Sequence, residues 1–373
     1  MANPQTSFIY TTFANNCFFA KKRDVVFRNT LPYQLSVLKE TGRYDAFRLQ
    51  HHPTYDDSMD HWPVPNHLFW DSDVAKWIEG ACYLLHTQED ATISAAIDKL
   101  VEMIRAAQLP DGYLNIHFTV VAPGQRFTNL RDLHELYNLG HLIEAALAHH
   151  QLYKNDQLLE PVVKYVNLLC RTFGPEENQR HGYPGHPEIE LALIRLYEVT
   201  NDPKHLTLAR YFITERGNAT GASGRHYYDI EAEERGERPF ERPNYYPVRR
   251  FYEYQQAHRP LLEQDSIEGH SVRAMYLLTA VADLVRIDEA IDREGYSSAV
   301  RRLWDNMVGK KMYLTGGIGA IKQYEGFGGD YFLPQSTDEG GCYAETCAGI
   351  GVMMLAERML QVRNPVPLTA PSI

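Results

Sequence analysis

The stretch FWDSDVAKWIEGACYLLHTQEDATISAAIDKLVEMIRAAQLPDG, residues 69–112, decides the fold. Apolar residues recur at helical spacing through residues 69–88 and again through residues 91–108, which predicts two amphipathic helices. Asp71 or Ser72 is the expected N-cap of the first helix. The Pro-Asp-Gly turn that follows the second helix ends the pair. The segment therefore predicts a helical hairpin.

The same pattern continues along the chain after residues 1–30, which read as irregular or β-like. Further helices are expected at residues 32–41, 131–153, 156–174, 181–200 (after a loop), 203–217, 266–287 and 296–312, and from Ala348 onward. Short connections alternate with long ones rich in His, Asp, Gly and Tyr, and residues 218–260 read as a long insertion. Successive hairpins of this kind predict an all-α protein, an α/α barrel with its polar loops at one mouth. With no boundary or linker in sight, residues 1–373 form one expected domain.

Composition excludes several classes of partner. The net charge is −11, which argues against a nucleic-acid or anionic-membrane surface. No apolar run reaches the length of a membrane span, and the N-terminus lacks the pattern of a secretory signal. The five cysteines have no framework spacing, so reduced thiols and a cytoplasmic location are expected.

Residues 315–354 hold the densest group of reactive side chains. Glu325 and Glu345 are carboxylates, and Cys342 and Cys347 are thiols beside the second of them. A Gly-rich loop here runs into an apolar helix, whose N-terminal dipole is expected to favour carboxylate and thiolate forms. The alternatives stay open: a Glu before a helix is often a capping partner, and a lone Cys is often a small buried hydrophobe.

Polar residues also gather at the helix junctions. Asp71 opens the first long helix, and His134, His186 and His270 each stand near the start of another. Singly, each residue reads equally well as a helix cap or turn residue. In an α/α barrel such junctions converge, and neutral His and Asp hydrogen-bond sugar hydroxyls. Glu325 becomes a candidate general acid if burial raises its pKa.

A metal site is a separate hypothesis. Glu345 and Cys347 are two residues apart, so in an extended chain they face the same side. A thiolate and a carboxylate suit zinc, but tetrahedral zinc takes four ligands. Cys342 as a third ligand is a guess.

A family resemblance adds to these observations. The sequence resembles the β-L-arabinofuranosidase family of glycoside hydrolases, family 127, over roughly residues 20–360. The motifs that carry it are LPYQLSVLKETGR, FWDSDVAKWIE, QLPDGYLN, HELYNLGHLIEAA, GYPGHPEIELALIRLYEVT, EGHSVRAMYL, TGGIG, the Glu325-Gly-Phe run and YAETCAGIG. The resemblance implies an (α/α)6 toroid barrel followed by β-sandwich domains. It also implies retaining cleavage of β-L-arabinofuranosyl groups, with a zinc-bound cysteine thiolate as nucleophile.

Residue by residue, the resemblance implies roles for several positions. Glu325 matches the general acid/base, and Glu345 and Cys347 match two zinc ligands. The expected sugar-binding residues are Gln34, His134, His186 and His270, to which Asp71 is added from its place at a helix junction. We therefore expect His134, His186, His270 and Glu325 to line a single sugar-sized hollow, with a small sugar or oligosaccharide as substrate.

The sequence departs from the family pattern in one respect. The family's nucleophile and last zinc ligand are a Cys-Cys pair well beyond the YAETCA motif, and this sequence, which ends at Ile373, contains no Cys-Cys. The expectation is an (α/α)6 barrel incomplete at the C-terminus, without the last barrel helices or the β-sandwich domains. Zinc is possible with an incomplete site, retaining activity is expected to be weak or absent, and a homodimer is possible. The alternatives are a sugar-binding pseudoenzyme and a repurposed barrel using Glu/His acid-base chemistry, such as a lyase, hydratase or inverting hydrolase.

Overall fold

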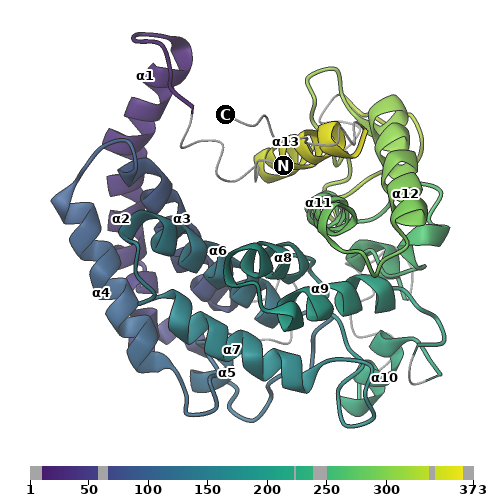
Figure 1. Cartoon of the computed structure of the whole chain (residues 1–373), viewed down its shortest axis with the longest axis horizontal. Coiled ribbons are helices and arrows are strands. Elements are labelled where there is room, and N and C mark those ends of the chain that lie inside the picture. The colour runs from purple at the N-terminus through teal and green to yellow at the C-terminus, as the bar shows by residue number, and fades with distance from the viewer. Residues whose placement is uncertain (1–10, 58–65, 222–223, 238–249, 336–340, 364–373) are drawn as a thin grey trace, which may run out of the picture. The chain divides into compact units, whose positions relative to one another are not determined.

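The structure is a computed structural model of the 373-residue chain. It describes residues 11–57, 66–221, 224–237, 250–335 and 341–363. Within those ranges every regular element is a helix, and β pairing is confined to four isolated bridges (Figure 1). These elements confirm the predicted all-α class, and helical hairpins are the repeat from which an (α/α)6 barrel is built. No helix in the described part of the chain is long and apolar enough to cross a lipid bilayer.

The chain divides into two compact units. The N-terminal unit comprises Ala2–Thr172 with Glu198–Asn201, and the C-terminal unit comprises Phe173–Tyr197 and Asp202–Ile373. Each unit is described by itself below. The single-domain organisation and the missing C-terminal parts stay predictions, and the Pro-rich tail, residues 364–373, lies outside the described residues.

The N-terminal unit is built around two helices that pack along each other, α3 and α6. Its α-helices are α1 (Phe18–Val25), α2 (Leu31–Glu40), α3 (Trp70–Leu85), α4 (Ala91–Ala107), α5 (His117–Val120), α6 (Glu135–Tyr153) and α7 (Leu159–Thr172). Helix α4 shows why the sequence folds this way. Asp90 caps it by accepting from the amides of Thr92 and Ile93 at 2.8 and 3.0 Å, and one face is buried at helical spacing: Ile93, Ile97, Leu100 and Ile104. Each such burial stabilises the fold by about 1.5–3 kcal/mol.

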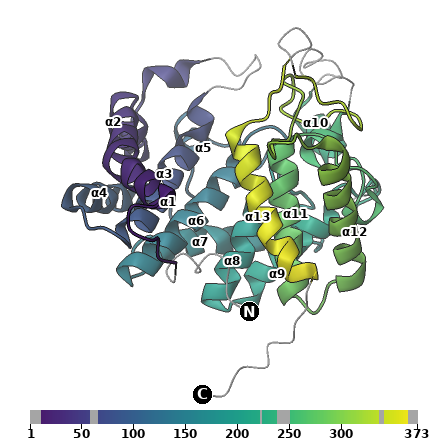
Figure 2. The same ribbon diagram turned by 90° about the horizontal axis from the view of Figure 1, so that it is seen from above.

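The C-terminal unit is centred on α11 (Ser271–Ile287), which contacts α12 (Arg293–Asn306), α13 (Thr346–Arg363) and α9 (Pro203–Glu215) (Figure 2). Helix α8 (Ile189–Thr200) belongs to this unit through Tyr197, and α10 (Tyr227–Glu234) is shorter. Helix α11 is buried on almost every side, as a central helix must be. Gly351 lets α13 approach it, because a Cβ at that position would lie 2.7 Å from the Cβ of Met275.

Three sequence predictions differ from the structure. Residues 1–30 are not irregular throughout: they include α1 and a π-helical turn, Val26–Thr30. Helix α1 buries no side chain, so it carries no apolar stripe for periodicity to detect. Neither Asp71 nor Ser72 caps α3, which begins at Trp70 with no side-chain cap bond. The expected insertion at 218–260 contains α10 and a 3-10 turn, and its residues 222–223 and 238–249 lie outside the described ranges.

Candidate active site

Glu325 is fixed against the start of α11 by its own backbone. The Glu325 carbonyl accepts from the Ser271 amide at 3.0 Å and from the Ser271 hydroxyl at 2.8 Å. A β-bridge joins His270 to Gly326, and the Phe327 amide donates to the Gly269 carbonyl at 2.9 Å. Glu325 itself has a positive φ of 55°, a conformation that non-glycine residues adopt at a cost. Hydrogen bonds from the start of α11 therefore hold the Gly-rich loop in a strained backbone conformation that places this carboxylate at the helix N-terminus.

His270 holds the Glu325 side chain. It is the N-cap of α11, and its Nδ1 accepts from the backbone amides of Val272 and Arg273 at 3.1 and 3.4 Å. A neutral imidazole carries one N–H, so Nε2 is the protonated nitrogen. His270 Nε2 therefore donates to Glu325 Oε2, at 3.0 Å. The helix cap thus sets both the tautomer and the direction of the hydrogen bond.

The charges at this pair differ from the sequence expectation. The hydrogen bond from His270 is the largest cause that lowers the pKa of Glu325, and it outweighs burial, which acts in the opposite direction. Burial lowers the pKa of His270. The condition attached to Glu325 as a general acid, a pKa raised by burial, is therefore not met in the free site, which holds an ionised carboxylate beside a neutral imidazole.

Tyr343 connects the two carboxylates of the loop. Its hydroxyl lies 2.8 Å from Glu325 Oε1 and 3.0 Å from Glu345 Oε1. Burial, followed by the two carboxylates, raises the pKa of Tyr343, so the phenol keeps its proton. The sequence analysis missed this residue. Its signal was the same spacing of two residues that paired Glu345 with Cys347, because alternate side chains of an extended segment face one side.

Glu345 and Cys347 lie together at the start of α13. The Cys347 Sγ is 3.5 Å from Glu345 Oε2. Burial and the charge of Glu325 raise the pKa of Glu345. Desolvation of the sulfur and then the charge of Glu345 raise the pKa of the Cys347 thiol to about 11, although the residue as a whole is exposed. The prediction that the helix N-terminus favours both charged forms is wrong, because desolvation and like charge outweigh the dipole.

Glu345 and Cys347, the two residues expected to bind zinc, lie together, and zinc binding stays a prediction. Glu345 and Cys347 offer a carboxylate and a thiol side by side. Among the described residues, however, no group of three or more His, Cys, Asp or Glu side chains is arranged so that it could hold a metal ion. Cys342, the guessed third ligand, lies beside the Tyr313 hydroxyl. Two donors do not complete the tetrahedral set that zinc takes.

His186 joins the cluster from the loop before α8. Its Nδ1 lies 3.1 Å from the Pro187 carbonyl oxygen, to which it donates. The His186 ring centroid lies 5.7 Å from that of His270 and 5.8 Å from that of Tyr276. Of the residues predicted to share one hollow, the C-terminal unit thus brings together His186, His270 and Glu325.

The other predicted sugar-binding residues belong to the N-terminal unit. Gln34 is exposed on α2. His134 precedes α6, with its ring 4.6 Å from that of Phe69. Asp71 is fully buried in the first turn of α3, and its Oδ1 accepts from the Ile116 amide at 3.0 Å. Burial raises the pKa of Asp71 to about 7. That these residues bind sugar stays a prediction.

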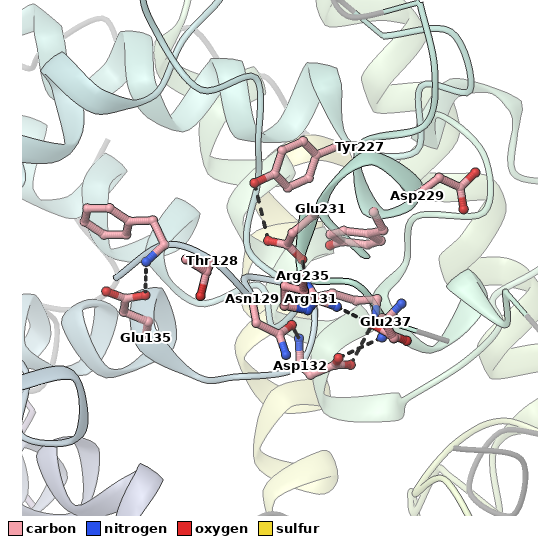
Figure 3. A network of polar contacts seen from close by, with 12 residues as sticks. Thr128, Asn129, Arg131, Asp132, Glu135, Tyr227, Asp229, Glu231, Arg235 and Glu237 are labelled. Atoms are coloured by element: carbon pink, nitrogen blue, oxygen red, sulfur yellow. Dashed lines mark hydrogen bonds and ion pairs between the residues drawn. The ribbon is translucent and has the colours of Figure 1, made fainter. Parts of the chain in front are cut away.

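A polar network fixes the loop that carries His134. Buried Glu135 accepts from the Phe127 amide at 2.8 Å (Figure 3). It also accepts from the Tyr113 hydroxyl. In the same loop the Asn129 side chain accepts from the Asp132 amide at 3.1 Å. The figure also shows a network of the C-terminal unit, in which Glu231 accepts from Tyr227 at 3.3 Å and from Arg235 at 2.9 Å. Each unit therefore holds its own polar loops by buried carboxylates.

Comparisons with known proteins agree with this geometry. Residues 14–367 match the family profile described as β-L-arabinofuranosidase, GH127 catalytic domain. The chain is 35% identical over 362 residues to the non-reducing end β-L-arabinofuranosidase of Bifidobacterium longum subsp. longum, covering 92% of this chain and 53% of the relative.

Solved structures give the same result. A GH127 β-L-arabinofuranosidase from Geobacillus stearothermophilus T6 is 38% identical, with a TM-score of 0.82 over 94% of this chain and 53% of that one. A second GH127 β-arabinofuranosidase is 34% identical, with a TM-score of 0.78 over 96% and 51%. The chain spans about half the length of these relatives. The resemblance seen in the motifs is confirmed, and the chain belongs to the β-L-arabinofuranosidase family, glycoside hydrolase family 127, through its catalytic domain.

Proposed function

We propose that this chain acts as a glycoside hydrolase on β-L-arabinofuranosides or a similar sugar, by a retaining mechanism with Glu325 as the acid/base. One observation carries the proposal: His270 and Tyr343 each hold one oxygen of the Glu325 carboxylate. A group that must give and take a proton at one place needs such fixed geometry. The relatives at 34–38% identity are themselves β-arabinofuranosidases.

Glu325 would act in two steps. As acid it would protonate the leaving glycosidic oxygen while a nucleophile bonds to the anomeric carbon, a part that the family resemblance gives to a cysteine thiolate absent from this sequence. As base it would then remove a proton from the water whose oxygen displaces that nucleophile and releases the sugar. The free carboxylate is ready for the second role, since the His270 hydrogen bond keeps its pKa low. The first role requires that a proton arrive when the sugar binds and displaces water from the half-exposed carboxylate.

The neighbouring side chains would hold the sugar. His186 and His270 would line the sugar site, where imidazole nitrogens suit directional hydrogen bonds to hydroxyls. The His186 ring is fixed by its bond to the Pro187 carbonyl, and in the free site both His270 nitrogens are engaged, at Glu325 and at the α11 amides. We assign Gln34, Asp71 and His134 to the same task as part of this proposal.

The proposal includes a bound zinc ion, for which the described residues supply two candidate ligands. Glu345 and Cys347 would supply two of its ligands, and the bound ion would stabilise a thiolate. Metal analysis of the purified protein after dialysis tests this, with Cys347→Ser against Cys170→Ser, a thiol on α7 of the other unit. Zinc retained equally by both variants would refute the assignment. None of the five cysteines forms a disulfide, which supports the proposal of a cytosolic location.

A second function is favoured by the direct His270–Glu325 hydrogen bond. An imidazole and a carboxylate in contact suit acid–base chemistry without a covalent intermediate, as in a lyase, a hydratase or an inverting hydrolase. Product stereochemistry separates this alternative from the retaining mechanism, because only the retaining route returns the β anomer first.

Incubation with 4-nitrophenyl β-L-arabinofuranoside tests the proposed function. Release of 4-nitrophenol, lost in Glu325→Gln, supports it. Glu325→Gln removes the titrating carboxyl at nearly the same size. Binding of the glycoside by calorimetry without turnover would favour the sugar-binding pseudoenzyme. Neither binding nor turnover, or turnover that survives Glu325→Gln, would overturn the proposal.

A further inference from the structure

Arg273 carries a buried charge for which the described part of the chain shows no hydrogen-bond acceptor at Nε or Nη1. It lies on α11, three residues after His270, and is 2% exposed. Its Nε and Nη1 are buried and have no hydrogen-bond partner among the described residues. The guanidinium carbon lies 4.3 Å from the ring centroid of Tyr254. A guanidinium has five N–H donors, so contact with a ring face leaves most of its hydrogen-bonding capacity unused.

The same unit contains an equally buried arginine that is paired through both of its terminal nitrogens, although its Nε has no partner among the described residues. Arg216, also 2% exposed, donates to Glu190 at 2.6 Å and to the carbonyls of Pro184 and Gln255, each at 2.8 Å. The fold is therefore able to satisfy a buried guanidinium by local pairing. An unpaired buried charge destabilises a protein by several kcal/mol in general. A cation–π contact offsets only part of that cost.

Arg273 stands beside the Glu325 cluster. Its charge acts on both members of the hydrogen-bonded pair, helping to lower the pKa of Glu325 and that of His270. Tyr254, whose face it covers, has its ring centroid 5.3 Å from that of His270. The unused donors therefore belong to the surroundings of the carboxylate assigned as acid/base.

We propose that Arg273 is a sugar-binding residue, whose unpaired N–H groups donate to hydroxyl or ring oxygens of a neutral sugar at Glu325. This inference rests on the proposed function and names a contact for the same site. A neutral ligand is required because Glu325 and Glu345 lie at the two ends of the Tyr343 bridge and disfavour an added anion. Sugar oxygens supply acceptors without adding charge.

The inference predicts opposite effects on stability and on binding. Arg273→Met keeps much of the side-chain volume and removes the buried charge. In the ligand-free protein this variant should raise the melting temperature by about 2–4 °C, because an apolar side chain replaces an unpaired ion. It should weaken sugar binding about tenfold to a hundredfold, the usual effect of losing hydrogen bonds from a charged donor.

The test combines thermal unfolding with calorimetric titration of methyl β-L-arabinofuranoside into the full chain. The matched control is Arg358→Met on α13, since Arg358 is also buried but pairs with Asp283 at 3.3 Å. Arg358→Met should lower the melting temperature and leave the sugar affinity unchanged. Arg273→Lys keeps the charge without the planar fork, so its affinity should fall between those of the wild type and Arg273→Met.

The outcomes separate this inference from the proposed function. If the wild type binds sugar without turning it over, and Arg273→Met binds it more weakly, the proposed hydrolase function is refuted and the Arg273–sugar contact is supported. Turnover and affinity that are unchanged in Arg273→Met overturn the contact alone. A lower melting temperature in Arg273→Met also overturns it, because the guanidinium would then be a stabilising part of the fold. A wild-type protein that neither binds nor cleaves the sugar would refute both the hydrolase function and the Arg273–sugar contact.

Discussion

His270 donates its Nε2–H to Glu325 Oε2 across 3.0 Å, while its Nδ1 caps α11. One imidazole therefore joins a structural task to a chemical one. The cap fixes the tautomer, the tautomer fixes the donor, and the donor keeps the carboxylate ionised. The properties of Glu325 consequently depend on the N-cap residue of a helix, which lies fifty-five residues earlier in the chain.

Removing that donor should raise the pKa of Glu325. In His270→Ala the largest cause that lowers this pKa is gone, and burial then acts unopposed by it. A step that needs the ionised carboxylate should therefore begin at higher pH in the variant. The measurement is the pH dependence of kcat/KM on 4-nitrophenyl β-L-arabinofuranoside. His181→Ala is the control and should leave the profile in place, because the His181 Nε2 lies against the Glu176 carbonyl in an exposed contact, at 3.1 Å. An unshifted profile in His270→Ala would contradict the assignment.

Tyr343→Phe should impair the same site from its other side. The variant loses the hydroxyl between Glu325 Oε1 and Glu345 Oε1, so the first carboxylate is held by His270 alone. We expect kcat to fall roughly tenfold to a hundredfold with little change in KM, as for the loss of a hydrogen bond to a charged group. Tyr331→Phe is the control, because Tyr331 is 71% exposed. Equal kcat in both variants would show that Tyr343 does not position the acid/base.

The helices that could be predicted are those with a buried face. Buried apolar residues at helical spacing, Ile93, Ile97 and Leu100, predict helix α4. Helix α1 buries no side chain, so the sequence pattern did not predict it. Periodicity reports burial rather than helicity, so a solvated helix held by local hydrogen bonds leaves no trace in the pattern.

The residues of the site could be predicted from the sequence, but the directions of their pKa shifts could not. The resemblance pointed to Glu325, His186 and His270, and the structure brings these three together. The pKa directions depended on Tyr343 and on the cap at His270, contacts that join residues far apart in sequence. The burial of Arg273 could not be predicted for a related reason. A charged residue in a helix normally points to solvent, and only the packing around α11 shows that Arg273 is buried.

Gly351→Ala should separate α13 from α11. The new Cβ would lie 2.7 Å from the Met275 Cβ, closer than two such atoms can stand, so the helices must shift. We expect a loss of about 1–3 kcal/mol in the free energy of unfolding, the usual cost of overpacking.

Gly349→Ala is the matched control on the same helix, since its Cβ would meet nothing within 4 Å. It should gain about 0.5–1 kcal/mol from helix propensity. Urea unfolding of both variants gives the comparison. If Gly351→Ala proved as stable as Gly349→Ala, the close packing of the two helices would be refuted.

A buried histidine pair should make the N-terminal unit sensitive to acid. His67 donates from Nδ1 to the Thr54 carbonyl at 2.9 Å, so its Nε2 accepts from His117 Nδ1 at 3.1 Å. Burial and then the neighbouring His67 lower the pKa of His117 to about 4. The unfolded chain, with a usual His pKa of about 6.5, therefore binds more protons than the native state between those values. Stability should fall as the pH drops from about 6.5 towards 4, by up to about 3 kcal/mol for this residue.

Urea unfolding between pH 5 and 7 should show a shallower pH dependence in His117→Gln than in the wild type, with exposed His51→Gln as the control. A pH dependence unchanged by His117→Gln would mean that the buried pair does not carry the acid sensitivity.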